Sequence, residues 1–319
     1  MKKKNLYSYK PWLILSVVVI SMVLIAFSSG NAADLESESI GFEQWTPVGY
    51  KEVTVEKPSG STDITASPQE GCVLVTNDMV SHWPLDDQVG ATNFLDVVNS
   101  FNGTCEGDSC PVRTIGKVGG AFNFVSGDSD VINVPADSGA AQTAYDNMAN
   151  GSFSVGIWVK TSQFCQHSEE QNNKVFVGRY RKTTGHGTWW VGCTEPGGVA
   201  VFRLRDSSDI ARQINGTTQI TDNKWHYIVG VRDASADKNY LYVDGQLEGI
   251  LELPDYNPAA DFNSDEDITM GAYNEPQNYY FNGTIDEVVL YDKDLLGSEI
   301  TNYYNACKTE DTFLPFVVR

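Results

Sequence analysis

The sequence predicts an all-β fold, built as a two-sheet antiparallel sandwich or jelly roll. Short runs rich in Val, Ile, Phe, Tyr and Trp alternate apolar and polar residues, which is typical of half-buried strands. Asn-Gly and Asp-Gly pairs, which suit tight hairpin turns, recur along the chain. Long helical periods are scarce, and strands do not alternate with helices as they would in a parallel sheet.

The first 33 residues predict export. Lysines precede the apolar run "WLILSVVVISMVLIAF" at 12–27, and small residues follow it. A membrane-spanning helix needs about 20 apolar residues, so this shorter run favours a cleaved signal peptide over a retained N-terminal anchor. The chain is therefore expected to be secreted or extracellular, and attached to the cell surface only if the anchor is retained.

The next segment, 34–70, is polar and acidic, and offers little to bury, so we interpret it as a flexible linker. The domain is expected at 71–308, and 309–319 is expected to be a C-terminal tail. Within the domain, strands are predicted in the runs "SFSVGIWVKT", "KVFVGRY", "GTWWVGCT", "VAVFRLRD" and "KWHYIVGVRD". The run "NYLYVDGQLEGI" predicts a hairpin around an Asp-Gly turn. Only "DLLGSEITNYY" at 294–304 reads as a helix.

Six cysteines suit an oxidising compartment and allow 15 pairings. Spacing favours a small loop closed by two of them and a second pair in the middle of the domain. The remaining two then lie at the ends of the folded region. The predicted disulfides are Cys105–Cys110, Cys165–Cys193 and Cys72–Cys307.

The chain carries 42 acidic and 22 basic residues, for a formal charge of −20. Nucleic-acid phosphates are held by Lys and Arg, so no nucleic-acid partner is expected. An acidic surface of this kind suits a well-solvated extracellular protein or a cation binder.

Six motifs follow one another in a fixed order: "HWPLDD" at 82–87, "FLDVVNSFNGT" at 94–104, "GKVGGAFNFVSGDSDVINVP" at 116–135, "SFSVGIWVKT" at 152–161, "NKWHYIVGVRD…NYLYVDGQLEG" at 223–249 and "FNGTIDEVVLYDKDLLGSEITNYY" at 281–304. This order resembles the laminin-G-like jelly roll of the concanavalin-A-like lectin/glucanase superfamily. The resemblance covers about 71–307 and implies a two-sheet antiparallel sandwich.

The strand expected near 281–291 carries two acids, Asp286 and Glu287, among apolar residues. Strict alternation divides it into one face with Ile285, Glu287, Val289 and Tyr291 and another with Thr284, Asp286, Val288 and Leu290. Neither face is polar, so the strand is expected to be covered on both sides. A carboxylate there needs partners, because an unpaired buried charge is very costly.

The resemblance implies a structural calcium ion as the partner of Asp286. The other ligands would be Asp86 or Asp87, together with Asp96, and backbone carbonyls would complete the oxygen shell. A second explanation stays open, in which Asp286 accepts hydrogen bonds from the N–H groups of a turn.

No catalytic motif is evident. Glucanases of this superfamily carry Glu-x-Asp-x-x-Glu on a strand, whereas the Glu-x-Asp here, at 106–108, lies in the small cysteine loop and precedes Pro111. His226 follows the Trp of the fifth motif and is interpreted as structural. We therefore expect a protein that is not an enzyme.

Aromatic residues indicate where a sugar would bind. Trp189 and Trp190 are adjacent on a strand and point to opposite faces, so one should lie in the core and the other is a candidate for exposure. Tyr273, Tyr279 and Tyr280 fall in a later loop. Together with the resemblance, they predict a recognition domain for a glycan or a cell-surface protein. A secreted glycoside hydrolase or lyase of the same fold is the alternative, and a structural surface or appendage protein is a third possibility.

Overall fold

The computed structural model describes residues 72, 77–165, 174–180, 187–194, 197–252, 261–273 and 280–308. The predicted export segment at 1–33, the linker at 34–70, the tail at 309–319 and Tyr279 lie outside the described residues. The described residues all belong to one compact unit, Ile64–Arg319.

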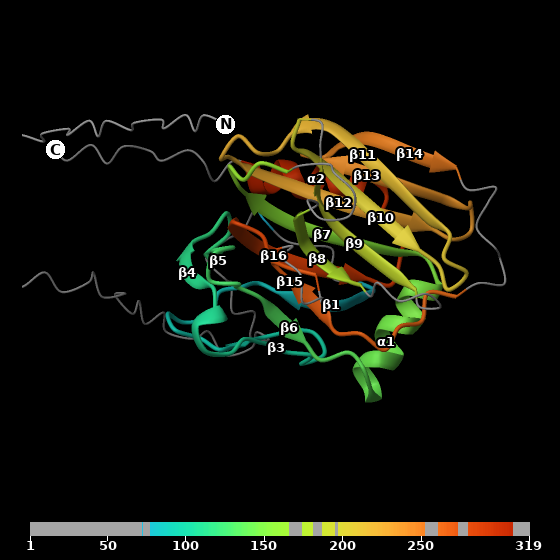
Figure 1. Ribbon diagram of the computed structural model, residues 1–319. Helices are drawn as coiled ribbons and strands as arrows, with labels where there is room; N and C mark the ends of the chain where they lie inside the picture. The colour runs from blue at the N-terminus through green and yellow to red at the C-terminus, as the bar shows by residue number, and fades with distance from the viewer. Residues whose placement is uncertain are drawn as a thin grey trace, which may run out of the picture. The chain divides into compact units, whose positions relative to one another are not determined.

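Two antiparallel eight-stranded sheets pack face to face as a sandwich, so the predicted fold class is confirmed (Figure 1). In the first sheet the strands run in the order β14 (Gln246–Glu252), β13 (Lys238–Val243), β12 (Trp225–Asp233), β7 (Phe153–Lys160), β16 (Gly283–Tyr291), β5 (Gly120–Phe124) and β4 (Val112–Ile115), with β1 (Met79–Trp83) also paired to β16.

In the second sheet the order is β11 (Ala211–Gln219), β10 (Val199–Arg205), β9 (Thr188–Thr194), β8 (Lys174–Arg179), β15 (Ile268–Met270), β6 (Ile132–Val134), β3 (Gly103–Thr104) and β2 (Asn93–Phe94). The predicted Asp-Gly hairpin joins β13 to β14, and both turn residues have positive φ, as a type I′ turn requires.

The main hydrophobic core lies between the two sheets, where the inward side chains of each strand meet. Trp189 of β9 packs against Phe153 of β7, with ring centroids 6.1 Å apart, and so joins the two sheets. A second cluster covers the outer face of the first sheet, where α2 (Gly297–Lys308) packs on it (Figure 1). Tyr227 of β12 meets Tyr303 of α2 at 4.8 Å between centroids.

The sequence predicted α2 but not α1 (Gly139–Asn150). The α1 segment, "GAAQTAYDNMAN", buries Tyr145, Met148 and Ala149. A short 3₁₀ turn also spans Gly107–Ser109. No helix within the described ranges is long and apolar enough to cross a membrane.

The predicted division of β16 into two faces was wrong because the strand contains a β-bulge. Its register with β7 shifts between Asp286 and Val289, and Glu287 has φ of 50°. A bulge inserts one extra residue and reverses the alternation beyond it. Ile285 and Val288 therefore both face the main core, whereas Val289 faces the outer cluster.

Three disulfides join the cysteine pairs that the spacing predicts. Their Cα–Cα distances are 4.6, 5.1 and 5.8 Å for Cys72–Cys307, Cys105–Cys110 and Cys165–Cys193. The longest links the segment before β1 to the last turn of α2 and spans 235 residues of sequence.

Candidate ligand-binding site

The candidate site lies on the outer face of the first sheet, at the margin of α2. Strand register places Trp225 of β12 directly opposite Lys160 of β7, and Tyr227 opposite Trp158. Residues two apart on a strand share a face, so all four point outward, on the side where Tyr227 meets α2.

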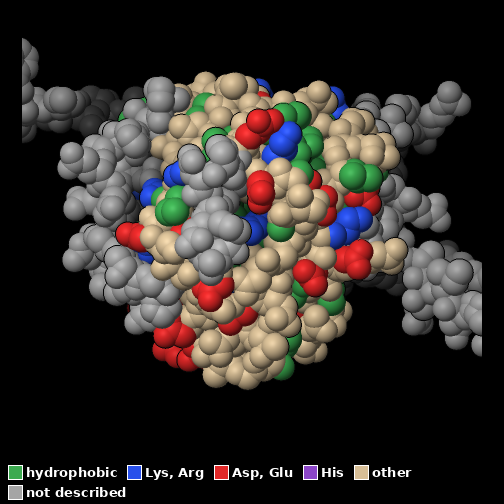
Figure 2. Space-filling view, turned by 90° about the vertical axis from the view of Figure 1, so that its right-hand side faces the viewer, with side chains coloured by type: hydrophobic (Ala, Val, Ile, Leu, Met, Phe, Trp, Pro, Cys, Tyr) green, Lys and Arg blue, Asp and Glu red, His purple; other side chains and the backbone are tan. Residues whose placement is uncertain are grey.

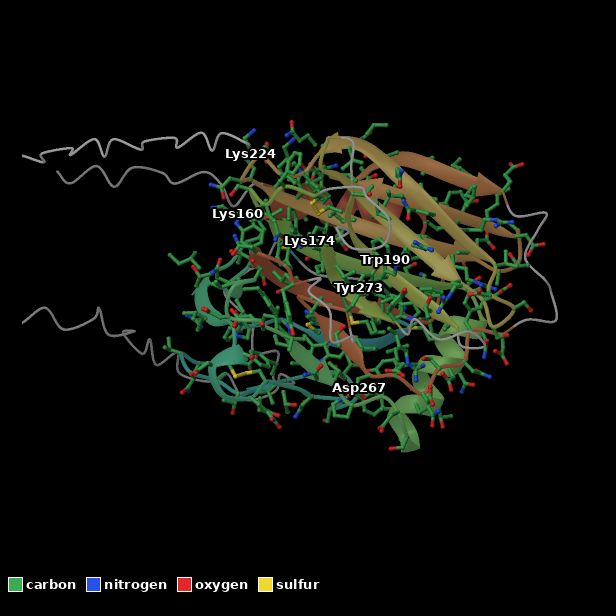
Figure 3. The ribbon with its side chains drawn as sticks, in the orientation of Figure 1. Lys160, Lys174, Trp190, Lys224, Asp267 and Tyr273 are labelled. Atoms are coloured by element: carbon green, nitrogen blue, oxygen red, sulfur yellow. A yellow bond between two sulfur atoms is a disulfide. The ribbon has the colours of Figure 1, made fainter. Side chains whose placement is uncertain are left out.

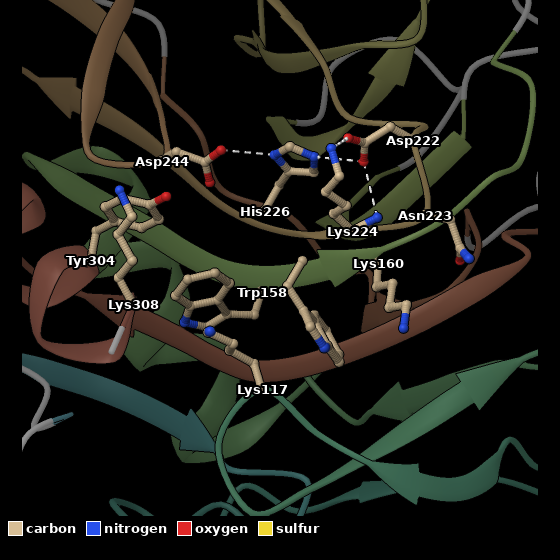
Figure 4. A pocket seen from close by; sticks show the side chains of 11 residues that line it. Lys117, Trp158, Lys160, Asp222, Asn223, Lys224, His226, Asp244, Tyr304 and Lys308 are labelled. Atoms are coloured by element: carbon tan, nitrogen blue, oxygen red, sulfur yellow. Dashed lines mark hydrogen bonds and ion pairs between the residues drawn. The ribbon is translucent and has the colours of Figure 1, made fainter. Parts of the chain in front are cut away.

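A cavity of about 520 Å³ opens beside these residues (Figure 4). This volume lies in the range of small-molecule sites. The turn between β4 and β5, strands β7 and β12, the loop before β12, the β13–β14 turn and α2 all contribute to its wall. The lining residues are Lys117, Trp158, Lys160, Asp222, Asn223, Lys224, Trp225, His226, Asp244, Tyr304 and Lys308.

Aromatic rings form the floor and one wall of the cavity. Trp158 is buried, and its ring stacks on that of Tyr304, with centroids 5.8 Å apart and planes 24° apart. Trp225 and Tyr304 are half-buried and keep part of their surface exposed. Rings with exposed faces beside hydrogen-bonding side chains are suited to contact both the apolar and the polar parts of a sugar.

Buried Asp286 holds one wall of the cavity in place. It lies opposite Trp158 in the β16–β7 pairing, and its Oδ2 accepts hydrogen bonds from the backbone N–H groups of Lys117 and Val118 at 2.7 and 2.9 Å. The turn so held carries the Lys117 Nζ to 5.4 Å from the centroid of the Trp158 ring. This explains the carboxylate in the middle of a covered strand: it fixes the β4–β5 turn against the sheet.

The environment of Asp286 favours its neutral form. Burial raises the pKa of Asp286 well above its ordinary value, and the nearby charge of Glu287 raises it further. The hydrogen bonds from Val118 and Lys117 lower this pKa but do not cancel the effect of burial. Glu287 itself is bonded to His82 of β1, with 2.8 Å between Oε2 and Nε2.

His226 lies between two carboxylates on the far wall (Figure 4). Its Nδ1 is 2.8 Å from Asp244 Oδ2, and its Nε2 is 3.0 Å from Asp222 Oδ1. Asp244 also accepts the N–H of Tyr227 at 3.0 Å. The histidine therefore ties the β13–β14 turn to the loop before β12, in agreement with its interpretation as structural.

These contacts shift the pKa values of His226 and Asp222 so that each group favours its charged form. Burial lowers the pKa of His226, but the hydrogen bonds and charges of Asp244 and Asp222 outweigh it, and the net pKa is raised. Burial would raise the pKa of Asp222, yet hydrogen bonds from Lys224 and His226 hold it well below its ordinary value. Asp244, His226 and Asp222 thus form a row of alternating charge along the cavity wall.

The predicted calcium ligands do not all meet. Asp86 joins Asp286 at the β4–β5 turn, because its Oδ1 accepts the N–H of Gly120 at 2.5 Å. Asp96 instead holds the loop after β2, where it accepts N–H groups of His82, Val98, Asn99 and Phe101. The alternative ligand Asp87 accepts the N–H of Leu95. Within the described part of the chain, no group of three His, Cys, Asp or Glu residues could hold a metal ion.

The four predicted sugar-binding aromatic residues that the structure describes do not line the cavity. Trp189 is in the main core, and Trp190 points to the outer face of the second sheet, as alternation predicts, but only 1% of it is exposed. Trp190 packs edge-on against Tyr273, with centroids 5.7 Å apart (Figure 3). Tyr280 is half-buried at the start of the segment that leads into β16.

Sequence reasoning missed the cavity because its lining comes from five separate segments. One local signal was present: "NKWH" at 223–226 places a cation, an aromatic ring and a histidine in succession. Only the pairing of β12 with β7 adds Trp158 and Lys160, and only the packing of α2 adds Tyr304 and Lys308.

The family model of the concanavalin A-like lectin/glucanases superfamily matches residues 135–301, just over half of the chain. The chain therefore belongs to this superfamily. No curated protein matches it in sequence.

Solved structures share the fold at low sequence identity. The binding domain of Paraclostridial Mosquitocidal Protein 1 is 14% identical, with a TM-score of 0.55 over 72% of this chain and 52% of that one. The botulinum neurotoxin serotype D binding domain is 17% identical, with a TM-score of 0.51 over 72% and 50%. The chain thus spans about half the length of these toxin domains.

A third structure is nearer in size. Domain 4 of AbnA, an extracellular GH43 arabinanase from Geobacillus stearothermophilus, was solved in complex with arabinotriose. It is 18% identical, with a TM-score of 0.50 over 71% of this chain and 98% of that one. At such identities these likenesses establish the fold alone.

Proposed function

We propose that this chain is a non-catalytic, extracellular recognition domain that binds carbohydrate in the cavity between β7, β12 and α2. The observation that carries the proposal is the cavity itself, of about 520 Å³, with half-buried Trp225 and Tyr304 beside polar side chains. Ligand sites of this kind combine apolar surface with a few placed polar groups.

The cavity is poorly suited to acid–base catalysis. The ring nitrogens of His226 are both bonded to carboxylates, and the same contacts occupy Asp222 and Asp244. A glycosidase needs one carboxylic acid and one carboxylate facing the scissile bond. A glycoside hydrolase or lyase remains the alternative, and the assay below separates it from binding.

Two further observations support the proposal. Relatives in fold were solved with sugars, namely domain 4 of AbnA with arabinotriose and a botulinum neurotoxin D domain with N-acetylneuraminic acid. The three disulfides suit an oxidising, extracellular compartment. A cell-surface glycan, or a glycosylated surface protein, is then the natural partner.

The test is a glycan array probed with the purified full-length protein, followed by calorimetry on the glycans that bind. Trp225→Ala and Tyr304→Ala should each weaken binding by roughly tenfold, because each removes an aromatic contact. Phe164→Ala is the matched control, since Phe164 is 64% exposed and does not line the cavity. The melting temperature of each variant shows whether it is folded.

Two results would contradict the proposal. Binding that withstands both aromatic substitutions would place the glycan elsewhere on the domain. Release of reducing sugar from a bound glycan, lost in an Asp222→Asn variant that remains folded, would make the domain an enzyme.

A further inference from the structure

The charge of the cavity wall contrasts with that of the chain. The whole chain has a formal charge of −20, and Figure 2 shows acidic side chains spread over the face that it presents. The cavity is lined instead by four lysines and two aspartates. A basic site in an acidic protein is costly to assemble unless an anion is bound there, because like charges repel at close range.

The two aspartates do not neutralise the four lysines. Asp222 is 2.9 Å from the Nζ of Lys224, and it shares His226 with Asp244. His226 adds positive charge when protonated, so the aspartates are already balanced by Lys224 and His226. Within the described residues, neither Lys160 nor Lys308 forms an ion pair.

These two lysines stand beside aromatic rings. Lys160 lies directly across from Trp225 in the β7–β12 pairing, where side chains approach to about 5 Å at Cβ. The Lys308 Nζ lies 5.7 Å from the centroid of the Tyr304 ring. Figure 4 shows the lysines distributed around the cavity, on elements that are distant in the sequence. Each cation is thus next to a ring that a sugar could contact.

We infer that the ligand is an anionic sugar, one that bears carboxylate or sulfate groups, and that Lys160 and Lys308, which lie on opposite sides of the cavity, bind its acid groups. This inference rests on the proposed function and narrows it to a ligand class. Sugar rings would lie against Trp225 and Tyr304, and the acid groups would displace water from the lysines. Hydrogen bonds between ammonium and carboxylate or sulfate are stronger than neutral ones.

The experiment compares matched glycan pairs that differ only in the acid group. The pairs are uronic acid and neutral hexose oligosaccharides, sialylated and desialylated glycans, and sulfated and unsulfated glycans, each titrated against the full-length protein. The acidic member of at least one pair should bind about tenfold more tightly, the change expected for one charge-assisted hydrogen bond. Which pair responds identifies the acid group.

Variants assign the preference to the named lysines. Lys160→Met and Lys308→Met should each reduce the acid preference, measured as the ratio of the Kd values of the neutral and acidic members, and Lys160→Arg should retain it. Lys238→Met is the control, since Lys238 pairs with Glu252 at 3.0 Å and does not line the cavity. Melting temperatures verify folding.

The possible outcomes distinguish failure of this inference from failure of the proposed carbohydrate-binding function. Equal binding of acidic and neutral members overturns the inference and leaves carbohydrate recognition intact. Absence of binding to every glycan overturns both. Binding of poly-aspartate as tight as that of the acidic glycan also overturns the inference, because the site would then recognise charge without a sugar.

Discussion

Asp286 contributes two hydrogen bonds that hold the β4–β5 turn against the sheet. Removal of its side chain would leave the buried N–H groups of Lys117 and Val118 without acceptors. Asp286→Ala should therefore lower the free energy of unfolding by about 1–3 kcal/mol. Asp286→Asn should cost less, since its amide oxygen still accepts both bonds and the raised pKa of Asp286 favours a neutral group. Urea denaturation of both variants tests this, and equal losses would contradict it.

Calcium binding through Asp286 stays a prediction, and the same variants decide it. If calcium binds the native state alone, a hundredfold excess over Kd stabilises it by roughly 2.7 kcal/mol. Chelator should then lower the melting temperature of the unsubstituted protein but not that of Asp286→Asn. A melting temperature that is indifferent to chelator would leave Asp286 as an anchor of the turn only.

His226 should make stability depend on pH. The pKa of His226 is higher in the folded chain than its ordinary value of 6.5, so the folded state binds the proton more tightly. Its contribution is then fully present below about pH 6.5 and is lost as pH rises through the folded pKa. The difference in unfolding free energy between the unsubstituted protein and His226→Gln should shrink as pH rises above about 6.5 and through the folded pKa of His226.

Asp222→Asn provides the matching control for that series. It removes one of the two carboxylates that raise the pKa of His226. The decline should therefore be smaller and end at lower pH in this variant. A difference that grows with pH would mean that the histidine is held in its neutral form.

At the scale of secondary-structure elements, α2 connects stability to the site. It packs on the outer face of the first sheet, supplies Tyr304 and Lys308 to the cavity, and is joined by Cys307 to Cys72 before β1. A bridge over 235 residues removes much more entropy from the unfolded chain than one over 5 residues. The Cys72–Cys307 disulfide thus ties the two ends of the domain together and holds α2, which forms part of the cavity wall, in place.

Replacement of both Cys72 and Cys307 by Ser should lower the free energy of unfolding by about 5 kcal/mol, against about 2 kcal/mol for the Cys105–Cys110 pair. The first change should also weaken glycan binding, because it frees the helix that carries Tyr304. The second should leave binding unchanged, since neither cysteine lines the cavity. Calorimetry and chemical denaturation measure the two effects, and equal stability losses would contradict the loop-entropy argument.

For the whole molecule, local patterns predicted the sandwich but not the site. Alternating runs and an Asp-Gly turn are properties of neighbouring residues, so β7, β12 and the β13–β14 hairpin could be predicted. The bulge in β16 could not, because it is a shift of register against β7, a strand that is distant in the sequence. The cavity likewise depends on contacts between distant segments. For Trp190, alternation predicted the face of the sheet on which it lies. Its burial could not be predicted, because it depends on tertiary packing.

The overall charge should limit the length of ligand that the cavity accepts. A short acidic glycan meets the lysines at contact distance, whereas a long polyanion also extends into the field of a chain with a formal charge of −20, which repels it. Such repulsion acts over the Debye length, about 10 Å at 0.1 M salt and 3 Å at 1 M. At low salt, an acidic disaccharide should therefore bind more tightly per site than the same unit inside a long polymer. Added salt should narrow this gap by screening the repulsion. Titration of matched short and long acidic glycans across a salt series measures it, and a gap that does not change with salt would show that the net charge has no part in ligand selection.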